Sequence, residues 1–172
     1  MPSKKLSSTG VFTRDLALGV VSAEADAETL GSVLLVDDNP TVLTLLGRTL
    51  TGAGYTISNA ATGAEAIAAV QANMPDLVLL DVHMPEMDGI EVCRQLKLDA
   101  VYSTIPILFV SGIDAPAHRA SCFKVDGVDF IAKPYSKSDI LARVKTHMRL
   151  SKLQSGLRAV VAEQSAHLRE SE

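Results

Sequence analysis

The sequence predicts an α/β fold in which five short parallel strands alternate with helices that cover both faces of one sheet. Three observations lead to this prediction. The 172 residues suit about one domain with a short tail. Hydrophobic residues make up 47% of the chain and charged residues 21%, as is typical of a globular protein. Short apolar runs bounded by turn-forming residues alternate with stretches of helical periodicity, which is typical of a parallel, doubly wound sheet.

The first strand is predicted at residues 33–36, an apolar run of the kind found in strands that are covered on both faces. Asn39 and Pro40 then suit the cap and the first position of a helix. This helix has an apolar face and is expected to end at Gly52 or Gly54.

The second and third strands are predicted at residues 55–58 and 76–81, which are again short and largely apolar. Thr62 and Glu65 have the spacing of a capping box. An alanine-rich helix should therefore begin there, and it must end before Pro75.

The remaining elements continue the alternation. Helices are predicted over residues 89–98 and 115–123, and strands over residues 105–110 and 128–131. A last helix begins at Ser136. Crossover connections between parallel strands are right-handed, so these helices are expected on both faces of the sheet.

The chain divides into three parts. Residues 1–31 are rich in Ser, Ala, Gly and Thr, and they are predicted to form a flexible leader. Residues 32–150 form the domain, and residues 151–172 form a helical extension. The apolar segment 16–23 resembles a short secretion signal, but Gly19 interrupts it. The protein is therefore expected to be cytoplasmic.

Composition argues against several classes of partner. The formal net charge is −4 and the pI is about 5.5, so no basic face for nucleic acid is indicated. No apolar run approaches the roughly 18 residues of a membrane helix. Cys93 and Cys122 lack a C-x-x-C spacing and are expected to be reduced and buried. The prediction is no direct nucleic-acid contact and no membrane contact.

Polar residues follow the predicted strands at one edge of the sheet. In parallel α/β sheets, ligands bind outside the carboxyl ends of the strands. The residues at these ends are Asp37, Asp38, Asp81, Ser111 and Lys133. A single aspartate in a loop is usually a solvated residue or a helix cap. That explanation is poor for five groups that the fold brings to one pocket.

The chemistry of this set is suited to phosphoryl transfer. Three carboxylates in one pocket repel one another, which raises a pKa or demands a cation. Oxygen ligands without His or Cys favour Mg²⁺. Lys133 supplies a positive charge for a phosphoryl oxygen, and Ser111 supplies a hydroxyl donor. With a carboxylate nucleophile, these groups predict a phosphoryl-transfer site.

This constellation resembles the signature of the receiver domains of response regulators in two-component signalling. The resemblance rests on matching spacings and on the sequence around Asp81, and it covers about residues 32–150. The motifs are Asp37-Asp38, Asp81, Ser111, Lys133-Pro134 and the segment 79–89. The resemblance implies a flavodoxin-like fold with strand order 2-1-3-4-5, here followed by an extended C-terminal helix.

The resemblance also implies a role for each residue. Asp81 would accept a phosphoryl group from the phosphohistidine of a histidine kinase or phosphotransfer protein. Asp38, Asp81 and the backbone carbonyl of His83 would ligate Mg²⁺, with Asp37 acting largely through water. Lys133 would pair with a phosphoryl oxygen.

Ser111 and Phe130 would form the switch: the hydroxyl would move onto the phosphoryl group, and the ring would turn inward behind it. The Lys133–Pro134 peptide bond is typically cis in this family. The imidazole of His83 is not expected to take part. The remaining histidines, His118, His147 and His167, are expected at the surface.

Other functions fit less well. No glycine-rich phosphate loop follows the first strand, so ATP and NAD are not expected. An aspartyl-phosphate hydrolase would carry a second aspartate at the position of His83. A degenerate receiver that only binds partners would be expected to lack an acid or Lys133. The chain is therefore predicted to be no conventional enzyme, catalysing only its own phosphotransfer and autodephosphorylation.

The last helix is longer than the domain requires. From Ser136 to about Arg169 it would be about 50 Å long, whereas a domain of about 120 residues is about 35 Å across. Apolar residues continue with heptad-like spacing at Leu150, Leu153, Leu157 and Val160. This favours a homodimer or a connector to an output domain. Gly156 weakens the helix, so fraying is the alternative. The surface of the fourth helix, fifth strand and fifth helix is the other candidate dimer face. The chain is expected to be either a stand-alone receiver or the receiver part of a larger regulator.

Overall fold

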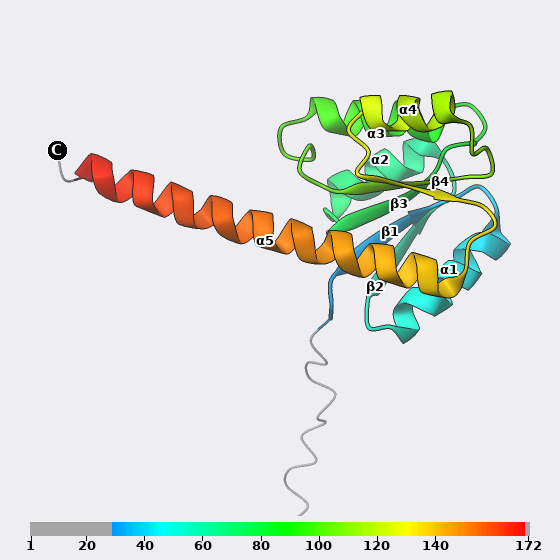
Figure 1. Ribbon diagram of the computed structural model, residues 1–172, viewed down its shortest axis with the longest axis horizontal. Coiled ribbons are helices and arrows are strands. Elements are labelled where there is room, and N and C mark those ends of the chain that lie inside the picture. Colours follow the sequence, from blue (N-terminus) through cyan, green and yellow to red (C-terminus); the bar gives the residue numbers. More distant parts are fainter. Residues whose placement is uncertain (1–28, 171–172) are drawn as a thin grey trace, which may run out of the picture.

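The computed structural model describes residues 29–170, so nearly all of the predicted flexible leader lies outside the described residues. Within this range, one parallel sheet lies between two layers of helices (Figure 1). The strand order is β2-β1-β3-β4-β5, and all neighbouring strands are parallel. The predicted fold class and strand order are confirmed.

Strands and helices alternate as predicted. The strands are β1 (Ser32–Val36), β2 (Thr56–Ala60), β3 (Leu77–Asp81), β4 (Ile107–Ser111) and β5 (Asp129–Ala132). The helices are α1 (Pro40–Gly52), α2 (Gly63–Ala72), α3 (Gly89–Leu98), α4 (Pro116–Lys124) and α5 (Lys137–Glu170). The predicted caps are present, since Asn39 caps α1 and Thr62 caps α2.

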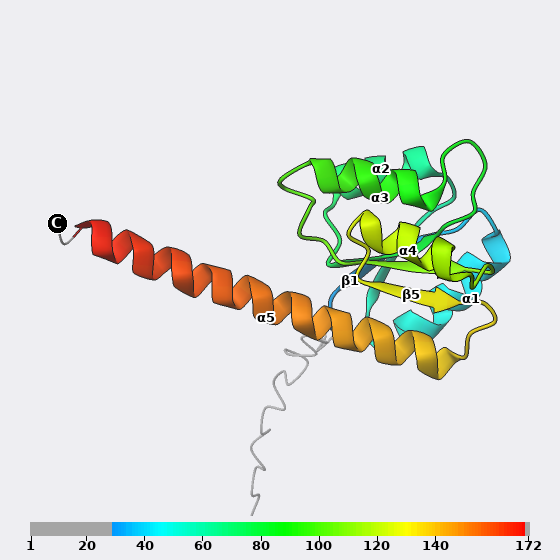
Figure 2. The same ribbon diagram turned by 45° about the horizontal axis from the view of Figure 1, so that its top comes forward.

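Each face of the sheet carries its own apolar layer. Helices α2, α3 and α4 cover one face, and α1 and α5 cover the other (Figures 1 and 2). Strands β3 and β4 are buried along their whole length. Alternate residues of one strand therefore enter different layers: Leu34 and Leu80 pack with α2 and α3, whereas Leu35 and Leu79 pack with α1 and α5.

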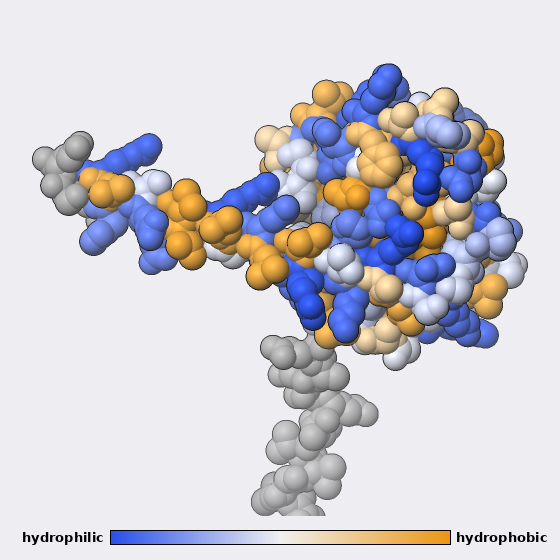
Figure 3. All heavy atoms as spheres, viewed as in Figure 1, coloured by the Kyte–Doolittle hydropathy of each residue, from blue (hydrophilic) through white to orange (hydrophobic). Residues whose placement is uncertain are grey.

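Helix α5 begins in the core and ends in solvent. Ile140, Val144 and Met148 are buried, whereas residues 152–169 are all exposed. The distal part projects from the domain in both ribbon views, and apolar side chains lie along it in Figure 3. The predicted helical extension is thus present as far as Glu170. None of the helices within residues 29–170 has the length and apolar character needed to cross a membrane.

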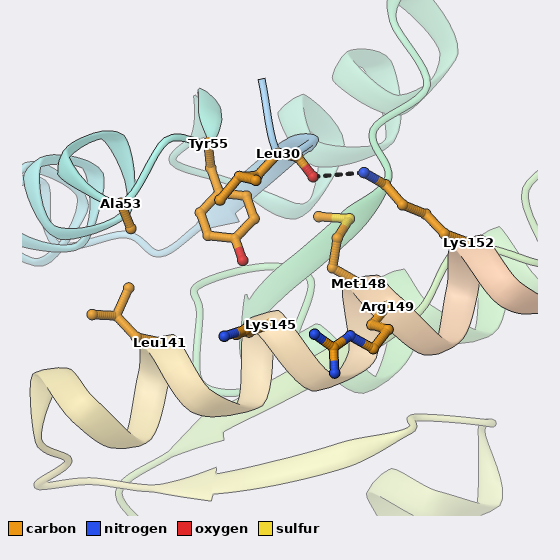
Figure 4. A pocket seen from close by; sticks show the side chains of 8 residues that line it. All are labelled: Leu30, Ala53, Tyr55, Leu141, Lys145, Met148, Arg149 and Lys152. Atoms are coloured by element: carbon orange, nitrogen blue, oxygen red, sulfur yellow. Dashed lines mark hydrogen bonds between the residues drawn. The ribbon is translucent and has the colours of Figure 1, made fainter. Parts of the chain in front are cut away.

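The segment that leads into β1 lies beside α5. Lys152 Nζ donates a hydrogen bond to the carbonyl of Leu30 at 2.8 Å, and the Leu30 N–H donates to the carbonyl of Gly54 at 3.0 Å. A pocket of about 420 Å³ opens here, with Lys145, Arg149 and Lys152 around apolar side chains (Figure 4). It lies at the amino end of β1, about 17 Å from the carboxyl end, and is therefore separate from the strand-end residues.

Candidate functional site

Three carboxylates meet where β1 and β3 end side by side. Asp37 and Asp38 directly follow β1, and Asp81 is the last residue of the neighbouring strand β3. One carboxylate oxygen from each lies within 4.8 Å of the others. Asp37 and Asp81 are buried, whereas Asp38 is exposed. The cluster is therefore open to solvent on the Asp38 side and could hold one metal ion there.

The turn after β1 fixes the Asp37 side chain. The N–H of Asn39 donates to Asp37 Oδ1 at 2.8 Å, while the side chain of Asn39 accepts a hydrogen bond from the N–H of Thr41. The start of α1 thus uses one Asp37 oxygen for the local turn. The other oxygen, Oδ2, faces Lys133.

Lys133 lies beside the carboxylates, as the strand-end pattern predicts. Its Nζ is 3.5 Å from Asp37 Oδ2 and 3.5 Å from Asp81 Oδ1. Its backbone N–H donates to the carbonyl of Ser111 at 2.8 Å, which holds the end of β5 against β4. The expected cis peptide bond between Lys133 and Pro134 is present.

The electrostatics of the cluster favour a bound cation. Burial raises the pKa of the Asp81 carboxyl and the charge of Asp37 adds to this, against the opposing effects of Lys133 and of the His83 N–H. Burial alone would lower the pKa of Lys133, but Asp81 and Asp37 outweigh it and the pKa is raised. One ammonium group therefore faces three carboxylates, and this excess negative charge is what a divalent cation relieves. Carboxylate ligands without His or Cys fit Mg²⁺.

The loop after β3 packs closely against Asp81. The N–H of Gly89 donates to the carbonyl of Val82 at 2.8 Å. A Cβ on Gly89 would overlap the backbone carbonyl oxygen of Asp81, so only glycine permits this approach. The loop in turn carries His83, whose N–H bonds to the Asp81 carboxylate. Its imidazole is not part of the three-carboxylate cluster found among residues 29–170.

Ser111 is fully buried at the end of β4. Its Oγ accepts a hydrogen bond from the N–H of Ile113 at 3.1 Å and lies 3.1 Å from Nε2 of His118. Phe130 is also buried, at 1% exposure. Its ring meets the edge of His118 at a centroid distance of 5.9 Å and lies beneath the guanidinium of Arg119 at 4.9 Å.

The sequence-based expectation for two histidines is wrong. His118 is half-buried between Ser111 and Phe130, and its ring stacks on that of His83 at 5.3 Å with an interplanar angle of 11°. His147 pairs with Asp129 at 2.9 Å. No motif marks His118, since only its place in the first turn of α4 brings it to the strand ends.

Comparisons with known proteins agree with this arrangement. The family model described as the response regulator receiver domain matches residues 33–145. Response regulator MprA of Mycobacterium ulcerans (strain Agy99) is 36% identical over 122 residues, which are 71% of this chain and 52% of the relative. The alkaline phosphatase synthesis transcriptional regulatory protein PhoP of Bacillus subtilis (strain 168) is 36% identical over 121 residues, 70% of this chain and 50% of the relative. The chain thus spans about half the length of these curated relatives.

Solved structures match the domain almost completely. The chemotaxis protein CheY4 of Vibrio cholerae has a TM-score of 0.65 and 30% identity, covering 67% of this chain and 96% of its own. A putative response regulator from Chloroflexus aurantiacus J-10-fl has a TM-score of 0.67 and 32% identity, covering 69% of this chain and 98% of its own. With the family match, the strand order and the clustered strand-end residues, the chain belongs to the response regulator receiver domain family of two-component systems.

Proposed function

We propose that the protein is a phosphorylation-activated switch in which Asp81 accepts a phosphoryl group from a histidine kinase or phosphotransfer protein. The observation that carries this proposal is the position of Lys133, 3.5 Å from both Asp37 and Asp81. This geometry leaves a carboxylate beside an ammonium group and two further acids. A receiver that only binds partners has no need of that combination.

The reacting groups have distinct tasks. An Asp81 oxygen attacks phosphorus as the phosphorus–nitrogen bond to the donor histidine breaks, which leaves an acyl phosphate on Asp81. Lys133 pairs with one phosphoryl oxygen, and the hydroxyl of Ser111 donates to another. When bound by Asp38, Asp81 and the backbone carbonyl of His83, Mg²⁺ supplies charge neutralisation for the transferring group. Asp37 orients this site through water and through its contact with Lys133.

The acyl phosphate is expected to persist long enough to signal. The position two residues after Asp81 holds His83, where an aspartyl-phosphate hydrolase would carry a second aspartate. The His83 ring stacks on His118. Hydrolysis therefore proceeds as slow autodephosphorylation, and the chain remains a signalling protein.

Incubation with acetyl phosphate and Mg²⁺, followed by intact mass measurement, tests this function. The wild type should gain one phosphoryl group, and Asp81→Asn should gain none. Asp139→Asn, which changes an exposed aspartate on α5, is the matched control and should label like the wild type. No labelling of the wild type would favour the degenerate receiver, and equal labelling of Asp81→Asn would exclude Asp81 as the acceptor.

The projecting part of α5 supports a second element of the proposal, a homodimer. Leu150, Leu153, Leu157 and Val160 recur at helical spacing and are 48%, 64%, 66% and 52% exposed. A helical segment this short is marginal in water unless its apolar stripe is covered. A second copy presents the same stripe and would cover it as a short coiled coil.

Light scattering tests the pairing of α5. The wild type should be dimeric at micromolar concentration, and Leu157→Glu should be monomeric. Ser155→Glu places the same charge outside the stripe and should remain dimeric. A monomeric wild type would exclude the homodimer and leave the stripe to an output-domain helix. A dimeric Leu157→Glu would move the interface to the α4–β5–α5 face.

Two further elements remain proposals. Cys93 and Cys122 are free and buried, which suits a reducing compartment and supports a cytoplasmic location. The receiver domain is proposed to act through protein contacts, without direct nucleic-acid or membrane contact. Its net charge of −4 supports this.

A further inference from the structure

We propose that His118 is a positioning residue that competes with the phosphoryl group for the hydroxyl proton of Ser111, and so couples Asp81 to the first turn of α4. The inference rests on the proposed function, because it requires a phosphoryl group on Asp81. It adds a residue of α4 to the switch pair Ser111 and Phe130.

The competition follows from the bonding capacity of one hydroxyl. Ser111 Oγ already accepts a hydrogen bond from the N–H of Ile113, and it lies 3.1 Å from His118 Nε2. A hydroxyl carries a single proton. In the arrangement we propose, Ser111 donates that proton to Nε2 of His118. A phosphoryl oxygen also needs a donor. The Ser111 hydroxyl can serve it only by turning its hydrogen bond away from the imidazole.

The His118 ring is held in place by neighbours on two other elements. It stacks on His83, in the loop that follows Asp81, at 5.3 Å. Its edge meets the ring of Phe130 on β5 at 5.9 Å. His118 therefore contacts residues next to the phosphoacceptor, the switch hydroxyl and the switch ring together.

Apart from His118 and the guanidinium of Arg119, which lies over the Phe130 ring at 4.9 Å, helix α4 has few attachments. Its N-cap, Ala115, makes no side-chain cap hydrogen bond, and Cys122 is its one buried residue. Most of its surface is exposed to solvent. The His118 contacts are thus a substantial part of what fixes the first turn of α4, and losing the Ser111 bond should loosen that turn.

The consequence is a direct link between the site and the α4–β5–α5 face, the second candidate dimer face. Phosphorylation draws the Ser111 proton toward Asp81, and His118 loses its partner. The first turn of α4 is then free to change its position. By reciprocity, a partner that binds α4 and pulls His118 away from Ser111 should prolong the phosphorylated state.

Calorimetric titration with beryllium fluoride and Mg²⁺, a phosphoryl mimic, tests the competition. His118→Phe keeps a flat ring against His83 and Phe130 but offers no acceptor to Ser111. It should bind the mimic about two- to tenfold more tightly, which is the range of one neutral hydrogen bond. His118→Gln restores an acceptor and should return the affinity toward the wild-type value.

A double-mutant cycle separates this role from a merely structural one. In a Ser111→Ala background there is no hydroxyl to compete for, so His118→Phe should leave the affinity for the mimic unchanged. Equal affinities of the wild type and His118→Phe would overturn the inference, and so would a gain that persists in Ser111→Ala. A wild type that takes up no mimic at all would instead overturn the proposed function, and this inference with it.

Discussion

At the scale of single residues, the site depends on polar groups placed at the ends of buried strands. Asp81 ends β3, whose five residues are all buried. Burying a carboxylate is costly unless it is paired, and Lys133 and the His83 N–H provide the pairing here. The backbone around Asp81 is equally constrained, because Gly89 lies directly against its carbonyl.

Replacing Gly89 by alanine tests that close approach. The new Cβ would overlap the Asp81 carbonyl oxygen, so the loop that carries His83 must shift. We expect the free energy of unfolding to fall by about 1–3 kcal/mol and labelling by acetyl phosphate to decrease. Urea denaturation and intact mass report the two effects. Gly52→Ala, at the end of helix α1 where a Cβ meets nothing within 4 Å, is the control and should lower neither the stability nor the labelling.

The burial of Asp81 predicts a pH dependence. Because burial raises its pKa in the fold, ionised Asp81 destabilises the folded state. The stabilising contribution of the protonated form is full below the unfolded pKa of about 3.9 and is lost as the pH rises through the folded value. Asp81→Asn should therefore resist urea better than the wild type at pH 7 in EDTA, with the difference shrinking toward pH 4. An Asn variant that is less stable at pH 7 would contradict this.

The sequence predicts the strand-end cluster better than it predicts the position of His118. Asp37, Asp38, Asp81 and Lys133 each follow an apolar run, and the parallel topology alone brings them to one edge. The position of His118 depends on how α4 packs over the strand ends. No local pattern encodes that packing.

At the scale of elements, too, local patterns predict some features, whereas packing between elements decides others. Strand β2 continues past the polar, exposed Asn59 to the buried Ala60, because β2 is an edge strand that pairs with β1 through its backbone. Apolar patterning detects burial and therefore predicts too short a strand there. Helix α5, by contrast, was predictable along its whole length. Its attachment to β5 was not, since it depends on Arg143 and His147, which bond Asp129 at 2.6 Å and 2.9 Å.

Asp129→Asn tests the attachment of α5 to β5. Burial would raise the pKa of Asp129, but hydrogen bonds from His147, from the Phe130 N–H and from Arg143 lower it overall. A lowered folded pKa stabilises the protein above the unfolded value of about 3.9, and this stabilisation is lost as the pH falls through the folded value. The variant should therefore be less stable than the wild type at pH 7, and the difference should vanish in acid. This is the opposite sign to Asp81→Asn, and an Asp129→Asn variant as stable as the wild type at pH 7 would refute it.

At the scale of the whole molecule, a packed domain carries a helix that extends beyond it. The buried residues of α5 end at Met148, and residues 152–169 contribute no buried side chain. The domain and the projecting helix are therefore expected to be separable in their stabilities. Only the stability of the domain should depend on the α5 residues in the core.

Two truncations test this separation at low protein concentration. A chain that ends at Ser155 should keep the thermal unfolding temperature of the full chain. A chain that ends at Arg143 loses Val144 and Met148 from the core, at about 2–5 kcal/mol for a large buried side chain, and should unfold at a much lower temperature. Calorimetry distinguishes the two. A large loss of stability in the Ser155 chain would show that the extension folds back onto the domain.

The hydrogen bond between Lys152 and Leu30 joins α5 to the segment before β1, near the point where the helix leaves the domain. Beyond it, residues 153–170 form a lever arm of about 27 Å. If α5 tilted by about 10° at Lys152, its C-terminal end would move by about 5 Å, which is the length of one helical turn. A displacement at β5 or α5 that is too small to alter the domain would therefore shift the end of the helix by about one turn relative to whatever it contacts.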